Sequence, residues 1–353
     1  MSRKNNFDTT FLNRLKKLPS LDSLDLHRWA DYIELRCFFN PDETFSRDEF
    51  LDCIKDYDDF FITKNSTVDY TTHLVNDEYD DEEVNHSVLN DRAYRSDMRQ
   101  RFAEDCFRIL ESRVHIFKNY PFTISSNKRV LYRNKHLNIK NKYYAFLLFT
   151  SSLDYIGNHQ DLFISSFDIF CLLVLKTLLP TRAEAHLFKP SSASISNNIF
   201  EGKQEDRLEQ LSKHLHETLI NEGKKGNLKK KKNVNSVDLI AWVSNGDSQN
   251  HLLSYTGQIF YALDWVDQNY LNRAKSLLSI IRISVPPVNL TFIPFSFRNC
   301  EGHWQRETDI GECVLLDRQR LLYHFQHNKS FFTSLPCYDV LEYLSKVKDK
   351  VYN

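Results

Sequence analysis

The chain has 353 residues, 41% of them hydrophobic, which is enough to bury one large core or two smaller ones. A content of only 8 Gly and 9 Pro excludes collagen-like and low-complexity chains. The 46 Lys and Arg nearly balance the 47 Asp and Glu, so net charge does not mark a nucleic-acid-binding protein and only local basic patches can support that function.

The cysteines and the apolar stretches bear on where the protein resides. Seven cysteines are scattered without a CxxC pair, which favours reduced and buried thiols. The first residues lack the apolar core of a signal peptide. The most apolar stretch, Leu162–Leu179, is interrupted by polar residues and is too short to span a bilayer. We therefore expect a soluble cytoplasmic protein with no membrane segment.

Residues 1–155 are predicted to form a mostly helical domain. The stretch 24–57 has a helical pattern with a break at 40–42, after which Ser46 and Glu49 have the spacing of a helix-starting capping box. From Arg92 to Phe117, apolar residues recur at helical spacing. A strand at 129–132 and a helix at 143–153 complete this part.

Residues 156–330 are predicted to form an α/β domain with a small mixed sheet, and residues 331–353 a C-terminal helix. Two apolar runs, Ser236–Val243 and His251–Phe260, are separated by a polar turn and predict a hairpin. The other predicted elements are helices at 161–179, 200–221 and 262–281, strands at 289–295 and 312–316, and a helix from 317.

The predicted hairpin carries polar side chains that suit a metal ion. Asp238 lies on its first strand and Gln258 on its second. Oxygen-bearing side chains on adjacent strands can point at one divalent cation, and hard oxygen ligands suit Mg²⁺. This spacing is the main indication of chemistry in the sequence.

Short motifs in this half of the chain resemble the restriction-endonuclease-like superfamily, also called PD-(D/E)XK nucleases, and within it proteins of bacterial defence. The resemblance covers residues 155–326. The motifs that carry it are Asp238–Trp242, Gly257-Gln258, Asp264-Trp265, Phe292–Phe295, Leu315–Leu321 and Phe167-Asp168.

The resemblance implies a restriction-endonuclease-like core in which a helix acid, a strand acid and a strand Glu or Gln bind Mg²⁺. The matching residues are Asp168, Asp238 and Gln258, which makes them the candidate catalytic and metal-binding residues. The family's lysine, two residues after the last ligand, is replaced by Phe260. Weak activity is therefore expected, unless another cation such as Lys275 or one of Lys229–Lys232 fills the space.

Each candidate ligand also has a structural interpretation. Asp168 can lie in the first turn of a helix, where the helix dipole favours an acid. Asp238 needs a partner because a buried, unpaired carboxylate is costly, but that partner can be a hydrogen-bond donor instead of a metal. Gln258 can be a hydrogen-bonded amide of the core.

Two basic segments are candidates for binding nucleic acid. A lysine run at 224–232 precedes the strand of Asp238 and is either a solvated loop or a grip on phosphates. Two arginines follow a helix cap predicted at Asp317. The candidate nucleic-acid-binding residues are Lys229, Lys230, Lys231, Lys232, Arg318 and Arg320.

Three functions are consistent with these patterns. The first is a Mg²⁺-dependent nuclease that acts on DNA in a bacterial anti-phage defence system, together with a protein partner. The second is a catalytically inactive nuclease-fold subunit that binds nucleic acid or scaffolds a partner. The third is an α/β protein of unrelated function. The retained Asp238 and Gln258 favour the first, and Phe260 favours the second.

Overall fold

The computed structural model describes residues 13–19, 25–55, 92–189, 199–220, 237–262, 265–266, 277–278, 280–325 and 329–347. The chain divides into two compact units. Unit 1 comprises 1–138, 299–302 and 344–353, and unit 2 comprises 139–298 and 303–343. The first limit falls before residue 155 because helix α6 (Ile139–Thr150) packs against helix α8 (Gln160–Leu178) of unit 2.

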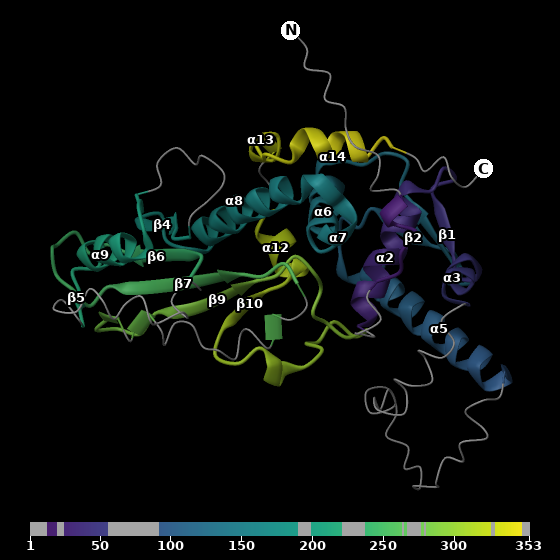
Figure 1. Ribbon diagram of the computed structural model, residues 1–353, viewed down its shortest axis with the longest axis horizontal. Helices are drawn as coiled ribbons and strands as arrows, with labels where there is room; N and C mark the ends of the chain where they lie inside the picture. The colour runs from purple at the N-terminus through teal and green to yellow at the C-terminus, as the bar shows by residue number, and fades with distance from the viewer. Residues whose placement is uncertain are drawn as a thin grey trace, which may run out of the picture. The chain divides into compact units, whose positions relative to one another are not determined.

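Unit 1 combines helices with a small sheet, as the ribbon of Figure 1 shows. Among its described residues are the helices α2 (Leu26–Phe39), α3 (Arg47–Ile54) and α5 (Arg92–Ile116). Its strands β1 (Thr44–Ser46), β2 (Phe122–Ile124) and β3 (Val130–Arg133) form an antiparallel sheet in the order β1-β3-β2.

The predicted capping box at the start of α3 is confirmed. The Ser46 hydroxyl accepts from the Glu49 amide at 3.1 Å, and the Glu49 carboxylate accepts from the Ser46 amide at 2.6 Å. Two backbone donors that the helix leaves without partners are satisfied in this way. The predicted break after α2 is also present, since Asn40 leaves the helix with extended backbone angles.

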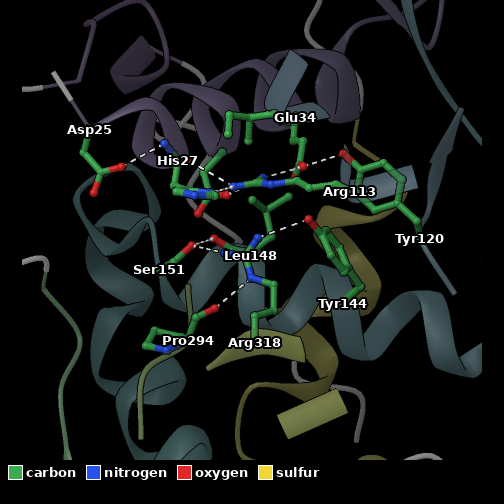
Figure 2. Close-up of polar contacts among 12 residues, drawn as sticks. Asp25, His27, Glu34, Arg113, Tyr120, Tyr144, Leu148, Ser151, Pro294 and Arg318 are labelled. Atoms are coloured by element: carbon green, nitrogen blue, oxygen red, sulfur yellow. Dashed lines mark hydrogen bonds and ion pairs between the residues drawn. The ribbon is translucent and has the colours of Figure 1, made fainter. Parts of the chain in front are cut away.

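The core of unit 1 contains a buried arginine. Arg113 of α5 is 1% exposed, and its Nη1 donates to Asp31 at 2.7 Å and to Glu34 at 2.5 Å. Tyr120 donates to the same Glu34 oxygen at 2.5 Å, and Arg113 Nη2 donates to the His27 carbonyl at 3.2 Å (Figure 2). Burying these charges requires such close pairing, because an unpaired ion in the interior is very costly.

Unit 2 is an α/β unit built on a five-stranded mixed sheet in the order β10-β9-β7-β6-β4. Strand β6 pairs antiparallel with β4 and with β7, whereas β7 pairs parallel with β9 and β9 pairs parallel with β10. The strands are β4 (Ala183–Leu187), β6 (Leu239–Val243), β7 (Leu253–Ile259), β9 (Val288–Phe292) and β10 (Val314–Leu316). A separate pair joins β5 (Thr218–Leu219) to β8 (Ile281–Arg282).

Helices cover this sheet. Helix α8 packs on β4 and lies along the sheet in Figure 1. Helix α9 (Gln204–His214) buries Leu208 and Leu211 in one apolar cluster with Ile240 and Trp242 of β6. Further helices of the unit are α6, α7 (Leu153–Ile156), α12 (Arg318–His324), α13 (Lys329–Phe332) and α14 (Tyr338–Leu344), of which the last continues into unit 1 by one residue.

The predicted hairpin of unit 2 is confirmed, and so is the α/β class with a helical N-terminal region. Strand β4 was not predicted, and the predicted helix at 200–221 is shorter because α9 ends at His214. The helix predicted at 262–281 lies mostly outside the described residues. Within the described residues, no helix combines the length and the apolar character that crossing a membrane requires.

Candidate functional site

Asp168 lies in the middle of helix α8, with its side chain buried. The helix begins at Gln160, and the acid of its first turn is Asp161. The interpretation of Asp168 as a first-turn acid is therefore wrong. Its side chain is only 4% exposed, so its charge must be balanced by groups that lie close to it.

Lys189 supplies the balancing charge. It lies two residues after the end of β4, and its Nζ is 2.7 Å from Asp168 Oδ1. The same Nζ is 3.6 Å from Asp238 Oδ1. One ammonium group is thus in contact with both predicted acids, one from a helix and one from the sheet.

Asp238 directly precedes β6 and is held by hydrogen bonds of its backbone and its side chain. Its amide donates to the Gly257 carbonyl at 2.9 Å, and its carbonyl accepts from the Phe188 amide at 2.7 Å. Its Oδ2 accepts from the Ile259 amide at 2.8 Å. These contacts to β7 and to the end of β4 leave Oδ1 as the oxygen that faces Lys189.

Tyr261 completes the polar cluster. Its hydroxyl donates to Asp168 Oδ1 and accepts from Lys189 Nζ at 3.1 Å. Burial raises the pKa of Tyr261 above its ordinary range, and the negative charge of Asp168 adds to this effect. The hydroxyl therefore keeps its proton and acts as a donor to Asp168.

Two carboxylates of the site face one ammonium group. Burial raises the pKa of Asp168, and this effect exceeds the opposite effect of Lys189 and the Tyr261 hydroxyl. The surroundings thus penalise the charged form of Asp168, a pattern that is common at functional sites.

Gln258 and Phe260 lie on either side of Ile259 at the end of β7. Asp238 bonds the residues on both sides of Gln258, so the backbone of Gln258 is next to the cluster, and its amide as a ligand stays a prediction. Phe260 points into an apolar cluster that includes Trp265, and it brings no charge to the site. The ammonium group next to the two acids is that of Lys189.

The structure does not place the other candidate cations of the sequence. Lys275 and the run Lys229–Lys232 lie outside the described residues. Lys189, by contrast, is the last residue before a gap in the described chain, at the beginning of the Ser- and Asn-rich segment.

The donor set fits a magnesium ion. Mg²⁺ is commonly held by one or two carboxylates, with water and substrate phosphate in the remaining positions. Asp168 and Asp238 supply two hard oxygen donors that already converge on one cation. Among the described residues, no group of three or more His, Cys, Asp or Glu side chains could hold a metal.

The two predicted arginines differ in their surroundings. Arg318 is 0% exposed, and it donates to the Pro294 carbonyl at 2.8 Å, to Ser151 Oγ at 2.8 Å and to the Tyr144 hydroxyl at 3.1 Å (Figure 2). An enclosed guanidinium cannot reach a phosphate, so the structure gives Arg318 a structural role in place of the predicted phosphate contact.

Arg320 remains a candidate for a phosphate contact. It is partly exposed, and its Nη1 donates to the Leu315 carbonyl at 2.8 Å. Its guanidinium lies 4.6 Å from the ring centroid of Trp304, and that of Arg298 lies 4.4 Å from the same ring. Such cation–π contacts orient an arginine without neutralising it.

Comparison of the chain with protein-family models, with curated proteins and with solved structures finds no match. The function has to be argued from the cluster of Asp168, Lys189, Asp238 and Tyr261.

Proposed function

We propose that unit 2 is a restriction-endonuclease-like domain that hydrolyses phosphodiester bonds in nucleic acid with Mg²⁺. The observation that carries the proposal is the meeting of a helix acid, Asp168, and a strand acid, Asp238, at one ammonium group. A further support is the mixed sheet with an antiparallel hairpin, which places the strand acid beside the end of its neighbour β7.

Each residue of the cluster has a role in this proposal. Asp168 Oδ1 and Asp238 Oδ1 would hold the metal, with Gln258 as a further ligand. When bound, Mg²⁺ polarises the scissile phosphate and lowers the pKa of a water molecule. Lys189 provides positive charge for the phosphate, and the Ile259 amide keeps the Asp238 carboxylate in a fixed orientation.

The nucleic acid needs contacts beyond the metal. Arg320 and the lysines Lys229–Lys232 are the proposed contacts to phosphate, which give a salt-dependent grip without sequence preference. The resemblance stated above makes anti-phage defence the proposed setting, with a protein partner of the same system.

A catalytically inactive role as a nucleic-acid-binding or scaffolding subunit is the second candidate. The observation in its favour is the position of Lys189, whose ion pair with Asp168 at 2.7 Å neutralises part of the charge that would attract a metal. Phe260 supports the same conclusion, because the family's usual lysine is replaced by a side chain of the apolar core.

A cleavage assay on plasmid and single-stranded DNA with Mg²⁺ or Mn²⁺ separates these candidates. Asp238→Asn and Lys189→Met should each lower the rate by about 10²–10³, the usual loss when one preorganised charge is removed. Matched controls are Asp247→Asn, in the exposed turn after β6, and Lys213→Met, whose side chain is 72% exposed. Both controls should cleave like the wild type.

Three outcomes are informative. Cleavage that Asp238→Asn abolishes and Asp247→Asn preserves establishes the nuclease. Cleavage that survives Asp238→Asn points to another site or to a contaminant and contradicts the proposal. If the protein binds DNA but does not cleave it, the inactive subunit is favoured, whether or not the protein binds Mn²⁺.

A further inference from the structure

The ammonium group of Lys189 occupies the place between the two carboxylates. It contacts Asp168 Oδ1 at 2.7 Å and Asp238 Oδ1 at 3.6 Å, and it donates to the Tyr261 hydroxyl at 3.1 Å. The second oxygen of Asp238 is held by the Ile259 amide, so the carboxylate cannot turn to offer a different oxygen without losing that bond.

A divalent ion bound by the same two oxygens would lie next to this ammonium. Like charges at such short range repel strongly, and the repulsion is larger where burial lowers the local dielectric constant. Lys189 and the metal therefore compete for Asp168 and Asp238.

Lys189 is also able to leave. Its side chain is 19% exposed and that of Asp238 is 15% exposed, whereas that of Asp168 is 4% exposed, so the lysine is partly open to solvent. A lysine ends in a point charge on a flexible stem of four carbons, and its contacts can be exchanged without movement of the backbone.

We propose that Lys189 is an exchangeable counter-ion, which neutralises the acid pair in the metal-free protein and is displaced when a divalent cation binds. This inference rests on the proposed function, because it takes the metal site as given. Its consequence is that the displaced ammonium becomes available to a substrate phosphate, so that the metal and the phosphate are bound together more readily than either alone.

The first experiment measures metal binding without catalysis. Mn²⁺ is titrated calorimetrically into the wild type, Lys189→Met and Lys189→Arg. Lys189→Met removes the charged hydrogen-bond donor that competes with the metal for the two carboxylates. Mn²⁺ should therefore bind to this variant at least about tenfold more tightly than to the wild type. Lys189→Arg keeps the charge and should bind Mn²⁺ as weakly as the wild type. Thermal melting checks that the variants are folded.

The second experiment follows the lysine itself in the unaltered protein. An amine-reactive reagent is applied with and without Mn²⁺, and the labelling of single lysines is read by mass spectrometry. Labelling of Lys189 should rise several-fold with Mn²⁺, because the amine has lost its ion pair. Lys213 is the control, because it lies on α9, forms an exposed pair with Glu209, and should label equally in both conditions.

The outcomes separate this inference from the proposed function. Tighter binding by Lys189→Met, together with metal-dependent labelling, supports the exchange. Equal or weaker Mn²⁺ binding by Lys189→Met, with binding in the wild type intact, overturns the exchange and leaves the metal site standing. If neither protein binds Mn²⁺, both the inference and the metal-dependent function fall.

Discussion

At the scale of single residues, the buried carboxyl group of Asp168 makes the stability of the folded protein depend on pH. Burial raises its pKa, so the folded protein holds a proton there at pH values where the unfolded chain has lost it. Stability from this group is therefore present in acid and is lost as the pH rises through the raised pKa of the folded state. At neutral pH the buried charge is a cost, which Lys189 and Tyr261 reduce without removing.

Asp168→Asn should consequently be at least as stable as the wild type at pH 7. The advantage of the variant should shrink as the pH falls from neutral through the range above the ordinary value of 3.8, because the wild-type carboxyl then takes up its proton. Chemical denaturation of both proteins between pH 4 and pH 8 measures the difference. A variant that is less stable at pH 7, with a gap that closes in acid, would mean that attraction to Lys189 outweighs burial.

The residues of the site differ in how well the sequence could predict them. Asp238 was found because an acid in an apolar strand needs a partner, and Asp168 because of the resemblance. Lys189 was missed because the preceding strand, Ala183–Leu187, is short and has no β-branched residues, although its apolar and polar residues alternate. Arg318 was predicted to contact phosphate but is buried. The local sequence does not reveal that an arginine directly after a helix cap points inward.

At the scale of secondary-structure elements, the two helix starts with serine caps give a matched comparison. Ser46 at the start of α3 makes its capping hydrogen bond, whereas Ser152 at the start of α7 makes no side-chain capping bond. Ser46→Ala should lower the free energy of unfolding by about 1 kcal/mol, the usual contribution of a cap. Ser152→Ala, the control, should cost less.

Urea denaturation of the two alanine variants is the measurement for this comparison. Equal losses in both would mean that the hydrogen bond of Ser46 contributes nothing beyond its packing. Short elements were predictable where a side chain marks them, as at Ser46. They were not predictable where pairing over a distance forms them, as in the strands β1, β5 and β8.

At the scale of the whole molecule, each compact unit contains a fully buried arginine with a different kind of partner. Arg113 of unit 1 is paired with the carboxylates of Asp31 and Glu34. Arg318 of unit 2 is bound by neutral oxygens of Pro294, Tyr144 and Ser151 (Figure 2). Loss of the first arginine removes the cation that pairs with two buried carboxylates. Loss of the second removes a donor to three neutral oxygens.

Arg113→Met should therefore cost about 3–5 kcal/mol, as the breaking of a buried ion pair usually does. Arg318→Met should cost less, about 1–3 kcal/mol for a buried polar group left without its partner. Hydrogen exchange should rise in α2 and α5 for the first variant, and in α6 and α12 for the second. If exchange rises in both units for either variant, the units unfold as one.

The order of the strands in unit 2 has a consequence for the protein during its synthesis. The acids and the lysine lie between residues 168 and 238 of the chain. Asp238 is held by β7, however, and β7 is paired with β9, which ends at Phe292. Pairings over such sequence distances form late, since the intervening chain must first be ordered. We expect a nascent chain to leave the ribosome as far as Phe292 before its acid pair is in place, so that the growing polypeptide does not yet carry the assembled cluster.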